Sequence, residues 1–210
     1  MAVHKAKTRS LILPKTYYLN DDVVSIARDL LGKILVTQNK SGEITSGRIV
    51  ETEAYDGTCD RASHAWLNKR TDRTEIMFAE GGFAYVYLCY GIHNLFNIIT
   101  GPENIPHAVL IRAIEPLTGV DIILERRGQK KLQRSTGGGP GIVSKALGIT
   151  LNDNKLPLYD SHIWLEDDGY KIQSSEILAS PRVGVDYAGE DALLPWRFRN
   201  KSNPFTSLAK

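Results

Sequence analysis

The apolar and polar positions over residues 47–55, Gly-Arg-Ile-Val-Glu-Thr-Glu-Ala-Tyr, are rich in β-branched side chains and predict a β-strand. Side chains of a strand point alternately to its two faces, so every second residue shares a face. The residues expected on one face are Ile49, Glu51, Glu53 and Tyr55. Two acids between apolar neighbours are compatible with an exposed edge strand, where charges prevent further pairing, and with a buried site.

A continuous apolar run over residues 108–114, Ala-Val-Leu-Ile-Arg-Ala-Ile, predicts a strand that is covered on both faces. Arg112 lies inside this run, and arginine is rarely fully buried unless it is paired. An unpaired buried charge would cost about 3–5 kcal/mol. Arg112 therefore needs a carboxylate partner, for which Glu51, Glu53 and Glu115 are candidates, unless its side chain extends to the sheet edge.

A second stretch, from Phe83 to Ile99, predicts a β-hairpin with many aromatic side chains. Its first strand carries Phe83, Tyr85 and Tyr87 on one face, and Val86, Leu88 and Tyr90 on the other. Gly91 then permits a sharp reversal of the chain. Tyrosines within a sheet commonly fill a core, but Tyr90 beside the turn is expected to be exposed. An exposed aromatic residue at a loop tip is often a binding residue.

The remaining pattern predicts several short strands and few helices. A helix is expected over residues 23–31, a strand over 33–37, a helix over 142–147, a strand over 162–166 with a hairpin turn at 167–169, a strand over 180–187 and a closing element over 195–200. This mixture indicates an α+β fold. We expect a single domain with a curved, mostly antiparallel β-sheet, flanked by helices and carrying a protruding β-hairpin.

Length and composition fit one globular domain. The chain has 210 residues, of which 42% are hydrophobic and 24% are charged. A basic, flexible N-terminal arm is expected over residues 1–18 and one domain over residues 19–205. The apolar run at residues 11–13 is too short for a signal peptide or a membrane span, so no membrane association is expected.

The formal net charge of +2 is a weak indication of nucleic-acid binding, and the distribution of basic residues is more informative. Two stretches contain no acid. They are residues 126–134, with Arg126, Arg127, Lys130, Lys131 and Arg134, and the tail from Pro195, with Arg197, Arg199, Lys201 and Lys210. Such stretches are commonly solvated loops, but together on one face they would form a footprint for phosphates.

The cysteine and histidine spacings contain no metal-binding pattern. Cys59 and Cys89 form no disulfide framework and suggest reduced thiols in a reducing compartment. The five histidines include no HExxH pair, and the zinc deaminase pattern is missing. We therefore predict no catalytic metal and no cofactor, although distant Glu and Asp residues could converge on Mg²⁺.

Two irregular segments are candidates for a functional role. The long loop over residues 56–74 contains His64 and the basic set Lys69, Arg70 and Arg73. Long loops in compact domains are usually functional or disordered. Gly-Gly-Gly-Pro-Gly at 137–141 lacks the spacing of a Walker A loop. At the start of a helix it could present N–H groups to a phosphate, or form an ordinary turn.

Several of these blocks together resemble the alkyladenine (3-methyladenine) DNA glycosylase family. The blocks are Val-Glu-Thr-Glu-Ala-Tyr at 50–55, His64, Tyr-Val-Tyr-Leu-Cys-Tyr-Gly at 85–91, Leu-Ile-Arg-Ala-Ile-Glu-Pro-Leu at 110–117, Gly-Gly-Gly-Pro-Gly at 137–141 and Ser-Pro-Arg-Val-Gly-Val at 180–185. Their joint occurrence in this order is highly specific. The resemblance implies an α+β repair enzyme that flips a damaged purine out of duplex DNA and hydrolyses its N-glycosidic bond.

The resemblance also implies a role for each matching residue. Glu53 corresponds to a general base that activates a water, and Arg112 to the residue that holds this water and keeps the carboxylate ionised. The implied lining of the base pocket is Tyr55, His64, Tyr87 and Asn97, the last as a gate against guanine. Tyr90 corresponds to the side chain that enters the minor groove, and the main chain of Val183 to a water contact.

Aromatic walls of this kind would favour cationic alkylpurines, since a cation gains about 0.5–2 kcal/mol over an aromatic face. A charged alkylpurine is also a good leaving group. Neutral hypoxanthine or ethenoadenine would need protonation or hydrogen bonding on the purine.

Three alternatives account for parts of the pattern. A bifunctional lyase would need a lysine nucleophile, and neither the Glu53 strand nor the hairpin contains one. A non-catalytic damaged-DNA-binding protein would not need Glu53 and Arg112. A carbohydrate glycosidase needs carboxylates on opposite sides of a sugar, whereas Glu51 and Glu53 are about 7 Å apart along one strand and point the same way. A monofunctional glycosylase that leaves an abasic site fits best.

The sequence leaves the preferred lesion open among 3-methyladenine, 7-methylguanine, hypoxanthine and ethenoadenine, and it assigns no role to Glu51. We expect a monomer that acts on double-stranded DNA containing damaged purines. The expected location is the cytoplasm, at the nucleoid, in a prokaryote, or the nucleus in a eukaryote.

Overall fold

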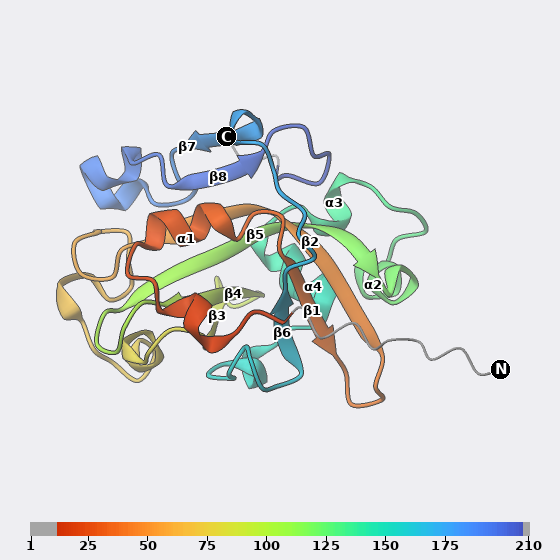
Figure 1. Cartoon of the computed structure of the whole chain (residues 1–210), viewed down its shortest axis with the longest axis horizontal. Helices are drawn as coiled ribbons and strands as arrows, with labels where there is room; N and C mark the ends of the chain where they lie inside the picture. The colour runs from red at the N-terminus through yellow and green to blue at the C-terminus, as the bar shows by residue number, and fades with distance from the viewer. Residues whose placement is uncertain (1–11, 208–210) are drawn as a thin grey trace.

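The computed structural model describes residues 12–207, which form short helices around one sheet (Figure 1). The α-helices are α1 (Val23–Asp29), α2 (Val120–Arg127), α3 (Arg134–Gly137) and α4 (Pro140–Leu147). The strands are β1 (Ile34–Gln38), β2 (Ile44–Tyr55), β3 (Ala84–Cys89), β4 (His93–Thr100), β5 (His107–Thr118), β6 (Ile163–Glu166), β7 (Ile177–Ser180) and β8 (Arg197–Asn200). Short 3₁₀-helices are η1 (Lys15–Leu19), η2 (Trp66–Asn68), η3 (Glu75–Phe78), η4 (Leu151–Asp153), η5 (Ser174–Glu176) and η6 (Asp186–Leu193). Of the helices that the structure describes, none is long and apolar enough to cross a membrane.

The described strands join one eight-stranded sheet whose pairings are all antiparallel. Its main path runs β3-β4-β5-β2-β1-β6, while β8 pairs with both β2 and β7. Figure 1 shows β2 and β5 side by side through the middle of the molecule, with β7 and β8 along one edge. The predicted α+β fold with a mostly antiparallel sheet is confirmed.

Strand β2 changes its partner halfway along its length. Its first half pairs with β1, and residues 51–53 pair with β8. On its other side β2 follows β5, with register shifts that leave Val50 of β2 and Arg112 of β5 without an opposite residue. Bulges of this kind redirect side chains and increase local twist. Three strands therefore meet around the two acids of β2.

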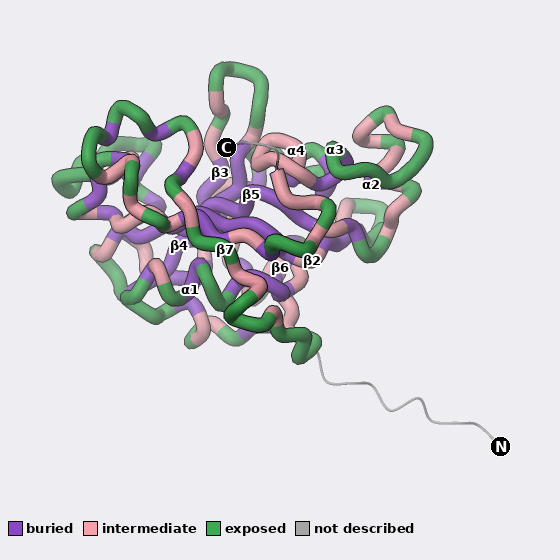
Figure 2. Tube along the Cα trace, turned by 90° about the horizontal axis from the view of Figure 1, so that it is seen from above, coloured by how far each residue is buried: buried purple, intermediate pink, exposed green. Residues whose placement is uncertain are grey.

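The central strands divide their side chains between a hydrophobic core and a cavity. Members of the core, which also contains residues of α1 and α4, include Ala54, Val86, Phe96, Ile98 and Ile111. Neighbouring residues on the same strands line the cavity, among them Tyr55, Tyr85, Tyr87, Asn97 and Arg112. Figure 2 shows the buried strands at the centre of the molecule and exposed loops around them. One face of these strands is thus used for packing, and the other is available for chemistry.

The hairpin turn predicted at 167–169 is wrong, because β6 pairs with β1 and makes no hairpin with the next strand. Asp167 and Asp168 instead form ion pairs with Lys33 and Arg48, at 2.7 and 2.8 Å. These pairs hold the segment after β6 against the β1 side of the sheet, from which the chain continues to β7.

The strand predicted over residues 180–187 is also wrong, because β7 ends at Ser180. Gly184, with φ +74°, then turns the chain towards η6. The main-chain N–H of Val183 bonds to the carboxylate of Glu53 rather than to a neighbouring strand. A tertiary contact has therefore overridden the extended preference of the β-branched residues in this segment.

The chain before α1 packs onto the sheet as far back as the structure describes it. Ile12 forms a bridge with β6, and Leu13 and Tyr18 are buried. Residues 12–18 of the arm predicted over residues 1–18 are therefore packed against the domain, with Leu13 and Tyr18 in its core. The remaining part of the arm, residues 1–11, lies outside the described residues.

Candidate active site

The Glu53 carboxylate is fully buried and is contacted by three donors. The Tyr55 hydroxyl donates to Oε2 at 2.7 Å, and the N–H of Val183 donates to Oε1 at 2.8 Å. Nη1 of Arg112 lies 3.2 Å from Oε2. A carboxylate has about four acceptor positions, so about one remains for a water molecule. The three donors all line a cavity, which places the carboxylate directly behind the cavity wall.

Arg112 is held between two acids, as the apolar sequence around it predicted. Its Nε lies 2.9 Å from Oε1 of Glu51, and Nη1 reaches Glu53. Its backbone carbonyl lies outside the regular β2–β5 ladder and accepts the N–H of Gly139 at 2.8 Å. Burial opposes the charge of Arg112, but the Glu53 and Glu51 carboxylates outweigh it and raise the pKa of the guanidinium. Arg112 is thus a permanent cation beside Glu53.

Glu51, to which the sequence assigned no role, is the acceptor that joins β8 and the C-terminal segment to β2. Its Oε1 accepts Nε of Arg112 at 2.9 Å, Nε of Arg197 at 2.8 Å and the Ser207 hydroxyl at 2.8 Å. Burial favours the neutral acid, but the charges of Arg112 and Arg197 prevail and lower the pKa of Glu51. Arg197, expected within a basic tail for phosphates, is only 1% exposed and is committed to this pair.

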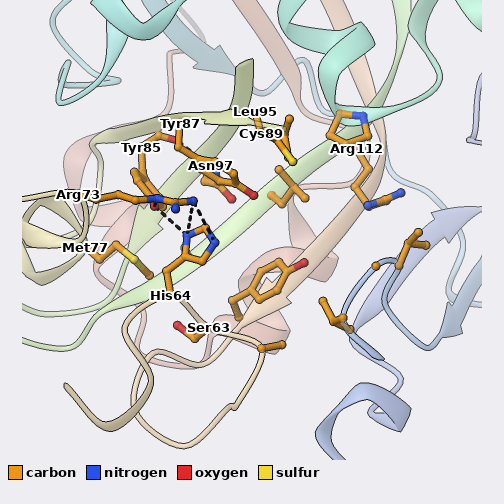
Figure 3. A pocket seen from close by; sticks show the side chains of 18 of the residues that line it. Ser63, His64, Arg73, Met77, Tyr85, Tyr87, Cys89, Leu95, Asn97 and Arg112 are labelled. Carbon is orange, nitrogen blue, oxygen red and sulfur yellow. Dashed lines mark hydrogen bonds between the residues drawn. The ribbon is translucent and has the colours of Figure 1, made fainter. Parts of the chain in front are cut away.

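A cavity of about 450 Å³ lies against the three donors to Glu53 and has aromatic walls (Figure 3). The structure places in its lining the predicted residues Tyr55, His64, Tyr87, Tyr90, Asn97, Arg112 and Val183. The rings of His64 and Tyr87 have centroids 4.8 Å apart and planes inclined by 75°. Residues from five separate parts of the chain therefore meet around one space, and only Glu53 lies behind its surface.

Tyr85 positions two of these residues and was not assigned a site role from the sequence. Its hydroxyl lies 2.8 Å from Nδ1 of His64, and its carbonyl accepts the Asn97 amide at 3.1 Å. Burial, followed by the charge of Arg73, lowers the pKa of His64 to about 4. His64 therefore contributes a neutral ring at physiological pH. The signal for Tyr85 was its place on the same strand face as Tyr87.

Tyr90 projects from the turn between β3 and β4, with 90% of its surface exposed. Its φ of +50° is unusual for a bulky residue, and such conformations persist at functional sites when the surroundings impose them. Gly91 follows with φ +73°, and Ile92 is 72% exposed. A tight turn thus presents Tyr90, which lines the cavity, and its neighbour Ile92 to solvent, as the hairpin pattern predicted for Tyr90.

Arg182 is a second residue that sequence reasoning missed. Its side chain is fully buried and forms an ion pair with Asp60, with Nη2 2.8 Å from Oδ1. Its guanidinium lies 4.8 Å from the ring centroid of Tyr55, and Nη1 donates to the carbonyl of Ala54 at 2.9 Å. The next residue supplies the Val183 N–H for Glu53. Arg182 therefore fixes both the Tyr55 ring and the segment that carries this donor.

The glycine-rich segment at 137–141 uses two of its N–H groups inside the protein and packs on β5, and a phosphate contact at the start of α4 stays a prediction. The N–H groups of Gly138 and Gly139 donate to the carbonyls of Arg134 and Arg112. A Cβ at Gly137 would come within 1.9 Å of the carbonyl oxygen of Ile114, so only glycine allows this approach. The close approach of this segment to β5, beside Arg112, therefore requires a glycine at position 137.

The basic stretch at 126–134 is divided between internal contacts and solvent. Arg126 donates to Thr45 and to the carbonyl of Ala146, whereas Lys130 and Lys131 are exposed. A DNA contact by this stretch stays a prediction.

Within residues 12–207, no group of three or more His, Cys, Asp or Glu side chains is arranged to hold a metal ion. Cys59 and Cys89 are free thiols. The predicted absence of a catalytic metal and a cofactor stays a prediction.

Known proteins of one family match this chain along almost its whole length. The family model described as methylpurine-DNA glycosylase matches residues 17–204. A protein of Chlamydia felis is 48% identical over 188 residues, which cover 89% of this chain and 95% of the relative. Proteins of Bacillus licheniformis and Methanocella arvoryzae are 45% and 43% identical, and each match covers 93% of this chain and 96% of the relative. All three are named "Putative 3-methyladenine DNA glycosylase".

Proposed function

Because the chain belongs to the methylpurine-DNA glycosylase family, we propose that it excises alkylated purines from duplex DNA and leaves an abasic site. Membership of this family makes it a DNA glycosylase, a DNA-binding hydrolase of base excision repair. The lesion, the flipping of the nucleotide and the absence of a lyase step belong to the proposal.

The observation that carries the proposal is the buried Glu53 carboxylate behind an aromatic cavity. The donors that hold Glu53 form the cavity wall, and the proposal requires that a water in the cavity reaches the carboxylate once DNA is bound. As a carboxylate beside the permanent cation Arg112, it can accept a proton from that water as the water attacks C1′ of the sugar. Its negative charge also stabilises the positive charge that develops on the sugar.

The cavity suits a flat base. Tyr55 and Tyr87 approach from β2 and β3, and His64 from the loop, so that a purine would contact rings on several sides. An alkylated purine with a positive charge gains about 0.5–2 kcal/mol from such faces. The neutral state of His64 removes one source of repulsion for this cation. Asn97 stands beside this space, where its amide would meet the edge of the base.

When a nucleotide is flipped out of duplex DNA, a side chain of the protein is expected to fill the space that the nucleotide leaves in the base stack. Unstacking costs a few kcal/mol, and an inserted side chain can offset part of this cost. Tyr90, almost fully exposed beside the cavity mouth, supports such a role, with Ile92 next to it. We propose that Tyr90 enters the minor groove at the position that the flipped nucleotide vacates.

A hydrolysis without a lyase step is favoured by the residues around the cavity. A lyase needs an amine nucleophile, and among the described residues no lysine lines this cavity. The intact network of Glu53 and Arg112 argues against the alternative of a non-catalytic damaged-DNA-binding protein, for which a buried acid held by a cation would have no use.

The proposal is tested with duplexes that carry one 3-methyladenine or one 7-methylguanine, with an undamaged duplex as the control. We expect release of the damaged base alone, and a strand that breaks only after alkali treatment. Binding without release would support the non-catalytic alternative. Strand cleavage without alkali would contradict the monofunctional reaction.

A further inference from the structure

Arg73 places a guanidinium inside the aromatic cavity. Its Cζ lies 4.7 Å from the ring centroid of Tyr87, and its Nε donates to the Tyr85 hydroxyl at 3.3 Å. Nη2 lies 3.2 Å from Nε2 of His64. These contacts hold the cation against the same rings that line the space for a base, although Arg73 as a whole is exposed to solvent.

The charge of Arg73 is not balanced by an acid. Arg112, Arg182 and Arg197 each form an ion pair with a buried carboxylate. The contacts of Arg73 are to a hydroxyl, an imidazole and an aromatic face, and no ion pair with a carboxylate is formed within residues 12–207. A cation at the cavity wall without a counter-ion attracts an anion that enters or forms beside it, and more strongly once a bound base excludes water from the cavity.

Arg73 and Arg112 lie at opposite ends of the cavity. Figure 3 shows Arg73 at one end and Arg112 at the other, with His64, Tyr87 and Asn97 between them. If the sugar lies beside Glu53, as the proposed function requires, a purine held between the rings extends away from Arg112 and towards Arg73. The end of the base that faces Arg73 is then part of the leaving group.

From this placement we propose that Arg73 stabilises the departing purine when that purine is neutral, and so determines whether neutral lesions are released. The inference rests on the proposed function. When the N-glycosidic bond breaks, its electron pair passes to the purine, while the attacking water gives its oxygen to C1′ and a proton to Glu53. A cationic alkylpurine becomes neutral in this step. Neutral hypoxanthine becomes an anion until it takes up a proton, and the Arg73 guanidinium pairs with this anion.

The same cation acts against charged lesions, because it lies beside any positive purine that enters. An adjoining cavity of about 320 Å³ shares Arg73 and His64 with the main one, which leaves room for the Arg73 side chain to move aside. Arg73 therefore shifts the preference of the site towards neutral bases, in opposition to the preference of the aromatic walls.

The test compares single-turnover release of hypoxanthine and of 7-methylguanine from otherwise identical duplexes at one pH and salt concentration. In Arg73→Gln, the ratio of the hypoxanthine rate to the 7-methylguanine rate is expected to fall about 100-fold, the usual effect of removing a donor from a developing anion. Arg73→Lys, which keeps the charge, should restore much of the ratio. The matched control is Arg70→Gln on the same loop, where Arg70 is paired with Glu75 and stacked on Phe78.

An unchanged ratio in Arg73→Gln would overturn the inference, as would an equal loss on both lesions, which would identify Arg73 as a phosphate contact. Arg73→Ala repeats the comparison if the glutamine variant melts below the assay temperature. Wild-type release of 7-methylguanine without release of hypoxanthine would also refute the inference and leave the proposed function intact. Failure of the wild type on 7-methylguanine as well as on 3-methyladenine would instead refute the proposed function.

Discussion

Nε of Arg112 lies 2.9 Å from Oε1 of Glu51, and this contact leaves Nη1 of the same guanidinium for Glu53. Glu51 therefore sets the orientation of Arg112 while it also neutralises Arg197. The two acids of β2 therefore have different roles. Glu51 binds the guanidinium groups of Arg112 and Arg197, and Glu53 accepts hydrogen bonds from residues of the cavity wall.

Glu51→Gln should destabilise the protein strongly. The substitution keeps the shape of the side chain but leaves Arg112 and Arg197 without their shared buried charge, and breaking a buried pair typically costs about 3–5 kcal/mol. Thermal unfolding measures this loss. The control is Glu115→Gln on β5, where the half-buried acid accepts a hydrogen bond from Asn203 and forms no ion pair within residues 12–207, so the expected loss is much smaller. Similar melting temperatures for the two variants would show that Glu51 has no such structural role.

Arg182→Met should lower stability by about 3–5 kcal/mol, because it leaves Asp60 buried without its partner. The double variant Arg182→Met with Asp60→Leu should regain much of this free energy of unfolding, since an apolar pair can replace a buried ion pair. Base release should stay slow in the double variant, because Tyr55 and Val183 lose their support. Full recovery of the release rate together with stability would refute a positioning role for Arg182.

His64 should make stability depend on pH between 6.5 and 4. Its pKa falls from the ordinary 6.5 to about 4 in the folded protein, chiefly through burial. The unfolded chain therefore binds the proton first, and the stability that neutral His64 contributes above pH 6.5 is lost as the pH falls towards 4. Urea unfolding at pH 7 and pH 5 should show a loss in the wild type about 1–2 kcal/mol larger than in His64→Gln. Equal losses in the two proteins would place the folded pKa of His64 near its ordinary value.

Tyr90→Ala should slow base release from duplex DNA more than it weakens binding to a duplex with a pre-made abasic site. The second substrate has no base to extract, so it isolates ordinary binding from extrusion. Because Tyr90 is 90% exposed, the free energy of unfolding should change by no more than about 0.5 kcal/mol. Equal losses on the two substrates would contradict a role of Tyr90 in extrusion.

The sequence predicted those parts of the site that depend on the alternation of side chains along a strand and on the cost of burying a charge. Alternation placed Glu53 and Tyr55 on one face, and an arginine in an apolar run required an acid, which Glu51 and Glu53 provide. The exposed position of Tyr90 followed from its place beside Gly91. These features are local, or they follow from the cost of burying a charge.

Other parts of the site depend on contacts between distant segments and were missed. The Asp60–Arg182 pair joins residues 122 positions apart, and no local pattern marks either residue as buried. Arg197 was expected among exposed basic residues because its sequence neighbours are basic, yet strand pairing of β8 with β2 buries it against Glu51. The segment after Ser180 has extended propensity, but its Val183 N–H is used by Glu53.

If Glu53 is the base of the reaction, the substitution Glu53→Gln should stop base release. Glutamine keeps the size of the side chain but cannot accept the proton of the water. The measurement is single-turnover release of 7-methylguanine from duplex DNA, with binding to a duplex containing an abasic site as the control for folding and DNA contact. We expect release to fall by about 100-fold or more while binding is retained. Release at the wild-type rate by a folded Glu53→Gln protein would contradict this role of Glu53.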